Sequence, residues 1–160
     1  MSEIDDGFIA DQTFSHLNAS IKLADQKASV LLSGQLAFIG LYLNFFGSSI
    51  QGNNALLTSS SLVGILSLAA VGCAISVITP RTVDTDEGLF LWESILQRET
   101  WREYETDIAE KNTGELRSEV LRQNYHLAQV ATRKYRALKF ALVFSGGMLL
   151  LAVVSVIIWI

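Results

Sequence analysis

The sequence predicts an all-α integral membrane protein with three transmembrane helices and a cytosolic helical bundle or stalk. Half of the 160 residues are hydrophobic and only 18% are charged, whereas soluble domains carry about 25% charged residues. The charges are also segregated, because Asp, Glu, Lys and Arg are absent from residues 28–80 and 140–160. A bilayer imposes this pattern, since a charge at its centre costs about 3 kcal/mol or more.

The N-terminal stretch, residues 1–27, is predicted to be a cytosolic amphipathic helix. One apolar stripe recurs there at helical spacing, at positions Phe14, Leu17, Ile21 and Ala24. Neither Gly nor Pro separates this stretch from the uncharged residues 28–47. We therefore expect a single helix that runs directly into the membrane as the first span.

The second and third spans are predicted at residues 61–79 and 140–160. Each is apolar and near the length of about 20 residues that a helix needs to cross the bilayer core. Residues 48–60 are polar, uncharged and rich in turn-forming types, which predicts an extracytoplasmic loop. Tyr42, late in the first span, is expected at the far membrane interface, where aromatic residues gather.

Residues 80–139 form the predicted cytosolic helical region. Its first half is interpreted as one or two helices that end near a turn at residues 112–114, and from Glu115 no helix breaker occurs for 30 residues. We expect that last helix to continue into the third span. Its packing seam has heptad-type spacing, at Leu116, Val120, Asn124, Leu127, Ala131, Lys134 and Leu138.

Lys and Arg predict the orientation of the chain. The loop at 48–60 has none, whereas all 12 basic residues lie in the segments on the other side. The positive-inside rule places that side in the cytosol. The N-terminus and residues 80–139 are then cytosolic, and the C-terminus is extracytoplasmic.

Several function classes lack support in the sequence. The two histidines, His16 and His126, are not part of a recognisable catalytic set. The single cysteine, Cys73, cannot form a disulfide within the chain or a Cys/His metal cluster. The net charge of −4 argues against binding to a nucleic acid polymer, which needs a basic surface. We expect no enzymatic activity, no cofactor and no metal site.

Polar residues in and beside the spans leave two interpretations open. Gln35 and Asn44 can hold helices together, which is the favoured interpretation, or line a polar path in an assembly. Asp25 and Lys27 stand where the first helix enters the membrane. They either anchor that helix at the interface or belong to a cytosolic polar pocket beside the stalk, together with Asn124, Lys134, Tyr135 and Arg136.

Four short motifs, in the right order relative to the spans, resemble the transmembrane effectors of the Pycsar antiphage system. The motifs are His16 with Ile21 and Ala24-Asp25-x-Lys27-Ala28-Ser29, Pro80-Arg81, the aromatic and acidic segment Leu89–Tyr104, and Gln123 through Lys134-Tyr135-x-x-Leu138. The resemblance covers nearly the whole chain. It implies a bacterial inner-membrane effector that acts by abortive infection, in which infected cells die before phage spread.

The resemblance also implies the signal. A neighbouring cyclase makes cyclic CMP or cyclic UMP, and this messenger activates the effector, which impairs the membrane. The chain has no room for a separate cyclic-nucleotide-binding fold, so the cytosolic helices would have to form the site, and a homo-oligomer in contact with membrane lipid is expected. The alternative function is a structural membrane adaptor whose cytosolic helices recruit a soluble partner.

A cyclic nucleotide needs a cation for its phosphate and an aromatic or amide group for its base. The cytosolic face near the bilayer supplies cations at Lys27, Arg81 and Lys134, and Asp25 is placed to orient Lys27 or to bond the ribose. The full set of predicted nucleotide-binding residues is His16, Asp25, Lys27, Arg81, Tyr104, Asn124, Lys134 and Tyr135.

Overall fold

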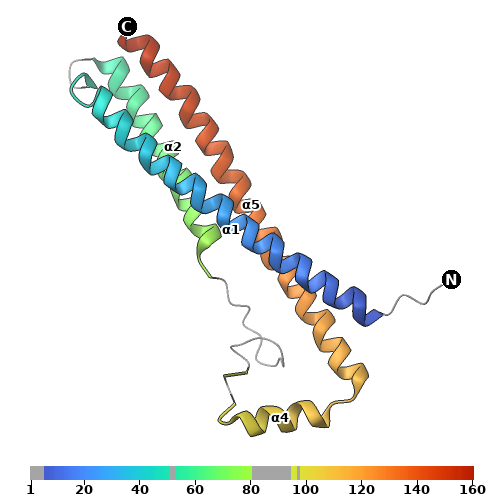
Figure 1. The fold of residues 1–160 in the computed structure, drawn as a ribbon. Coiled ribbons are helices and arrows are strands. Elements are labelled where there is room, and N and C mark those ends of the chain that lie inside the picture. The colour runs from blue at the N-terminus through green and yellow to red at the C-terminus, as the bar shows by residue number, and fades with distance from the viewer. Residues whose placement is uncertain (1–5, 51–52, 81–94, 97) are drawn as a thin grey trace, which may run out of the picture. The chain divides into compact units, whose positions relative to one another are not determined.

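The structure, a computed structural model, describes residues 6–50, 53–80, 95–96 and 98–160. Its helices are α1 (Asp6–Phe46), α2 (Asn54–Ile78), α4 (Trp101–Glu110) and α5 (Thr113–Trp159), and no strand occurs in the described part of the chain (Figure 1). Three of the helices, α1, α2 and α5, are long and apolar enough to cross a membrane. The predicted all-α class with three membrane-spanning helices is confirmed.

Helices α1 and α5 are each unbroken across the predicted entry into the membrane. Helix α1 has 41 residues and α5 has 47. Helix α5 begins at Thr113, so the turn predicted at 112–114 is in fact a helix start. Asn112 caps it: the Glu115 amide donates to Asn112 Oδ1 at 3.0 Å, and the Asn112 amide donates to Glu115 Oε2 at 2.9 Å. This reciprocal pairing satisfies two backbone donors that the helix start leaves free.

Helix α2 begins earlier than the sequence indicated. Residues 54–60, which we expected in the loop, form its first turns. Asn53 caps the helix by accepting from the amides of Ala55 and Leu56. The Thr58 hydroxyl then bonds to the Asn54 carbonyl at 2.9 Å. Polar side chains that favour turns in isolation are thus satisfied by the helix backbone, which is why composition alone misjudged this boundary.

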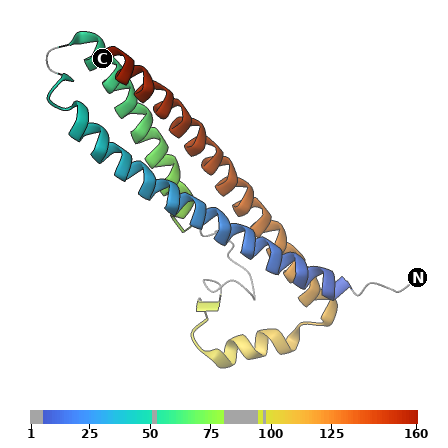
Figure 2. The same ribbon diagram turned by 45° about the horizontal axis from the view of Figure 1, so that its top comes forward.

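The chain divides into two compact units. The membrane unit comprises Lys22–Pro80 and Arg133–Ile160, and the polar unit comprises Met1–Ile21 and Arg81–Thr132. In the membrane unit α1, α2 and α5 lie side by side, with α1 and α5 in one direction and α2 in the other (Figures 1 and 2).

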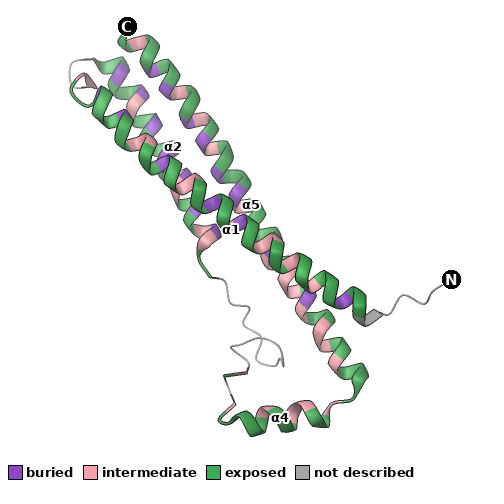
Figure 3. Ribbon diagram, viewed as in Figure 1, coloured by how far each residue is buried: buried purple, intermediate pink, exposed green. Residues whose placement is uncertain are grey.

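Buried positions in the membrane unit recur every three or four residues (Figure 3). On α2 they are Leu56, Ser59, Val63, Ser67, Ala70, Ala74 and Val77. This spacing is typical of coiled-coil packing. Only 17–28% of the most apolar stretch of each long helix is buried inside the chain. Most apolar side chains therefore face outward, as expected where lipid is the solvent.

The polar unit has a thinner core. Helix α4 carries no buried residue. Asp107 of α4 forms an ion pair with Arg98, which precedes the helix, with 2.6 Å between Arg98 Nε and Asp107 Oδ2. Ala10 of α1 and Ala131 of α5 are buried. Residues 81–94, which hold much of the predicted aromatic segment, lie outside the described residues.

Candidate functional site

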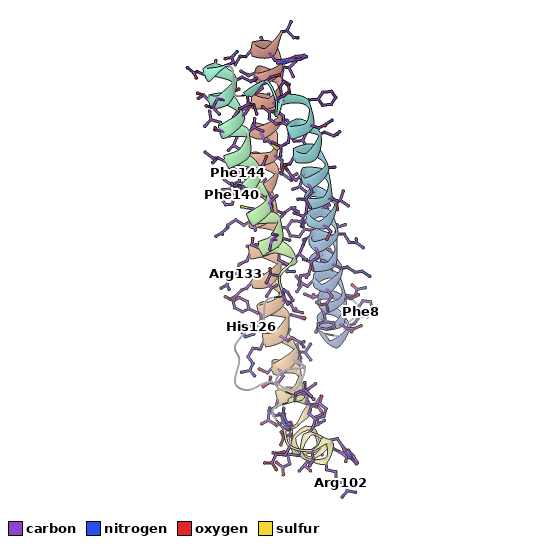
Figure 4. The ribbon with its side chains drawn as sticks, turned by 90° about the vertical axis from the view of Figure 1, so that its left-hand side faces the viewer. Phe8, Arg102, His126, Arg133, Phe140 and Phe144 are labelled. Atoms are coloured by element: carbon purple, nitrogen blue, oxygen red, sulfur yellow. The ribbon has the colours of Figure 1, made fainter. Side chains whose placement is uncertain are left out.

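A buried ion pair joins α1 to α5 in the membrane unit. Lys134 is 3% exposed, and its Nζ lies 2.5 Å from Asp25 Oδ1. Lys134 occupies the predicted packing seam of α5, so its side chain turns inward, whereas its neighbour Arg133 is exposed (Figure 4). Burying a charge is costly unless the charge is paired. Asp25 therefore determines whether Lys134 can remain in the core.

The ion pair adjoins an apolar cluster of small residues. Ala24 and Ala28 on α1 are fully buried and pack with Val77 and Leu138. Alanine side chains allow helices to approach closely, which brings the α1 carboxylate within reach of the α5 ammonium group. No charged residue follows Lys27 until Arg81. The pair consequently lies where the charged part of the bundle gives way to the uncharged part.

The other predicted site residues of the membrane unit are on its surface. Lys27 is exposed, and Tyr135, one position after Lys134, is 37% exposed. Of the four candidates in this unit, the structure thus brings Asp25 and Lys134 into direct contact. Lys27 and Tyr135 remain accessible to a soluble ligand.

The candidates in the polar unit have separate surroundings. His16 is exposed on α1. Asn124 is buried, and its Nδ2 donates to the Ala10 carbonyl at 2.9 Å, while its Oδ1 has no hydrogen-bond partner among the described residues. The guanidinium carbon of Arg98 lies 5.4 Å from the centre of the Tyr104 ring. Arg81 lies outside the described residues.

Gln35 holds helices together, as the favoured interpretation stated. It is 4% exposed, and its Nε2 donates to Ser145 Oγ at 2.5 Å, which links α1 to α5. Asn44 is exposed on α1. The structure therefore separates two residues that the sequence analysis had grouped.

Tyr42, which the sequence predicts near the far membrane interface, is buried among the helices. It is 7% exposed, and its hydroxyl donates to Ser155 Oγ at 2.9 Å and lies 2.9 Å from Ser60 Oγ. Tyr42 is seven residues after Gln35, so the two side chains occupy the same face of α1. Among the described residues, no group of three or more His, Cys, Asp or Glu side chains is placed to hold a metal ion.

Comparisons with known proteins identify the family. The family model of the Pycsar effector protein domain matches residues 9–160. The Pycsar effector protein SaPycTM of Staphylococcus aureus is 30% identical over 133 residues, which cover 82% of each chain. No solved structure matches the chain significantly. This chain therefore belongs to the Pycsar effector family of membrane proteins, and its role is that of an antiphage effector.

Proposed function

We propose that a cyclic pyrimidine nucleotide, cyclic CMP or cyclic UMP from a neighbouring cyclase, activates this effector, which then impairs the bacterial inner membrane. The family membership and the three membrane-spanning helices support an effector that acts in the membrane. The single observation that carries the messenger proposal is the buried ion pair between Lys134 and Asp25. In this proposal the phosphate of the messenger replaces the Asp25 carboxylate at the buried Lys134 cation.

The chemistry of the messenger fits this pair. Its cyclic phosphate carries one negative charge, and Asp25 is only partly shielded from solvent, with a side chain 34% exposed. In our proposal the phosphate approaches through the exposed Lys27 and competes with Asp25 for Lys134. Tyr135, next to Lys134 on α5, then stacks on the base. When the phosphate displaces the Asp25 carboxylate from Lys134, the ion pair that joins α1 to α5 is lost.

The proposal includes a topology and an assembly state. The charge asymmetry favours a cytosolic N-terminus and an extracytoplasmic C-terminus. A reporter fused after Ile160 should read extracytoplasmic, and one inserted near Asn112 should read cytosolic. If both reporters read cytosolic, the third span does not cross. We also propose that activated chains form homo-oligomers, which crosslinking in membranes would show as multimers.

Vesicle leakage tests the function directly. The purified protein is reconstituted in dye-loaded vesicles, and cyclic CMP, cyclic UMP or cyclic AMP is added. We expect a pyrimidine nucleotide to release the dye, while cyclic AMP has no effect. Failure of both pyrimidine nucleotides to cause leakage would contradict the proposal.

Matched variants then locate the site. Lys27→Ala should insert normally but lose the response, because Lys27 is an exposed messenger contact. Lys22→Ala is the control, since Lys22 is another exposed lysine of α1, five residues away. A headgroup anchor contributes about 1 kcal/mol to membrane attraction, so its loss leaves the response intact. If the two variants respond alike, Lys27 is an anchor and the site lies elsewhere.

One observation favours the adaptor alternative. In the polar unit Trp101 is 69% exposed on α4, which has no buried residue. Tryptophan is enriched at the centres of protein interfaces. An adaptor would retain a soluble partner through Trp101 and would cause no leakage with either nucleotide. The vesicle experiment therefore separates the two functions.

A further inference from the structure

The core of the membrane unit contains two layers of polar side chains. In the first layer Gln35 bonds to Ser145, and Ser67 is 2% exposed. Gln35 Oε1 and Ser67 Oγ have no hydrogen-bond partner among the described residues. Buried polar groups without partners are costly. The closed bundle thus retains polar groups that its packing does not satisfy.

The second layer lies two turns further along α1. Tyr42 donates to Ser155, and Ser155 Oγ lies 3.0 Å from Ser59 Oγ. Ser60 also lies within 2.9 Å of the Tyr42 hydroxyl. Seven residues separate Gln35 from Tyr42, which places the layers about 10 Å apart at 1.5 Å per residue. All three long helices contribute a hydroxyl or amide group to these layers.

The outward face of the same unit has the opposite character. Its large side chains are apolar and exposed to the surroundings, including Leu36, Leu43, Leu68, Leu150 and Ile157. A bilayer would cover this face with acyl chains, so water cannot be conducted along it. Within this unit, the buried layers supply polar side chains that could line a water path once the helices separate.

The seam between α1 and α2 contains a groove. Its volume is about 240 Å³, with Phe38, Tyr42, Val63, Gly64 and Ser67 among its lining residues. A side-chain carbon added at Gly64 would meet no atom within 4 Å. By contrast, the Gln35–Ser145 and Tyr42–Ser155 hydrogen bonds, which the messenger does not displace, hold α1 to α5. The groove reaches polar residues of both layers.

We propose that activation opens the bundle along the groove between α1 and α2, and that the two buried polar layers then line the water path of the assembled effector. The inference rests on the proposed membrane-impairing function. The proposed opening differs from a rival mechanism in which several chains associate while each helix bundle stays closed. In that rival mechanism the path would be lined by polar residues that are already exposed on α1, such as Ser33 and Asn44.

Cysteine accessibility distinguishes the two mechanisms. The native Cys73 is replaced by alanine, and single cysteines are introduced by Ser67→Cys and Ser155→Cys in the core and by Ser33→Cys and Asn44→Cys on the outer face. Each variant is reconstituted in vesicles and treated with a charged, membrane-impermeant methanethiosulfonate reagent, with and without the pyrimidine nucleotide. The exchange of serine for cysteine is nearly isosteric, which preserves the closed fold.

We expect the nucleotide to raise the reaction rate at Ser67→Cys and Ser155→Cys by about tenfold or more, because an inactive protein populates its minor state at 10% or less. The outer cysteines should change much less. Leakage without any gain at the core positions, or with a gain at the outer positions alone, would overturn the inference. Absence of leakage in the Cys73→Ala parent would instead overturn the proposed function on which it rests.

A crosslinked pair supplies a second measurement. Tyr42→Cys with Ser60→Cys, bridged by a short reducible bis-thiol reagent, ties α1 to α2 across the groove. We expect leakage to be lost with the bridge and restored by reduction. The matched control, Phe46→Cys with Trp159→Cys, replaces two residues that belong to neither polar layer and whose rings are in contact between α1 and α5. Its bridge should leave leakage in place. If the bridge from α1 to α2 leaves leakage unchanged, the bundle does not open at this seam.

Discussion

Helix α5 contacts α1 in both units, but the contacts differ in chemistry. In the polar unit a neutral amide of Asn124 donates to the backbone carbonyl of Ala10. In the membrane unit a buried ammonium group of Lys134 meets the carboxylate of Asp25. Both α5 residues belong to one packing seam, ten positions apart.

This difference bears on how a signal can enter the molecule. Losing a neutral hydrogen bond costs about 1 kcal/mol, because water or the backbone replaces it. Losing one partner of a buried ion pair leaves an uncompensated charge, which costs about 3–5 kcal/mol. In the proposed mechanism an anion at Lys134 would therefore act strongly on the α1–α5 contact of the membrane unit, whereas the Asn124 contact between the same helices in the polar unit carries no charge.

The largest effect is expected from Asp25→Ala. This variant leaves the Lys134 cation buried without its carboxylate, and we expect a loss of about 2–4 kcal/mol, somewhat below the usual value because Asp25 is partly exposed. The measurement is the midpoint temperature of thermal unfolding in detergent, with circular dichroism as the signal that monitors unfolding. The double variant Asp25→Ala with Lys134→Ala is the control. It removes both charges, and its midpoint should lie above that of Asp25→Ala.

A double variant as unstable as Asp25→Ala would show that the charge of Lys134 is already satisfied by other groups. The contrast between the two units would then lose its electrostatic basis. Arg133→Ala provides a further control, since Arg133 is exposed beside Lys134 and its removal should leave the midpoint nearly unchanged.

Gln35→Leu tests the uncharged contact of the membrane unit. It removes the hydrogen bond to Ser145 and also the carbonyl oxygen that has no partner among the described residues. Hydrogen bonds between membrane helices contribute about 0.6 kcal/mol on average, so we expect a small decrease in the unfolding midpoint. Ser145→Ala, which keeps the Gln35 amide buried without that partner, should be the more destabilising of the two. The reverse order would indicate that Gln35 has another partner.

The smallest effect is expected from Asn124→Leu in the polar unit. The Ala10 carbonyl loses a donor but stays within a helix, and the unpaired Asn124 Oδ1 is removed at the same time. Replacing such groups by an apolar side chain of similar size is close to neutral, within about 0.5 kcal/mol. The measurement is the rate of hydrogen exchange at the α5 backbone amides around residue 124, which should be nearly the same in the variant and in the parent protein. Strongly faster exchange would mean that Asn124 fixes α5 against α1.

Much of the fold could be predicted from the sequence because its causes are local. The absence of charge over residues 28–80 and 140–160 predicts the spans, and the lack of helix breakers predicts the continuous α1 and α5. The seam spacing also placed Lys134 on the inner face of α5. Helix α2 shows the limit: Asn53 and the hydroxyls after it form helix contacts that their turn propensity hides.

Tertiary structure decided the partners of the polar residues. Asp25 and Lys134 are 109 positions apart, and Tyr42 and Ser155 are 113 apart. Which residues meet depends on how far α1 is shifted along α5, and side-chain packing in the core sets that shift. A periodic sequence pattern shows on which face of a helix a residue lies, but it does not show which residue of a neighbouring helix lies at the same level along the helix axis. For this reason the sequence left open whether Asp25 orients Lys27 or bonds the ribose of a ligand, whereas the folded chain pairs it with Lys134.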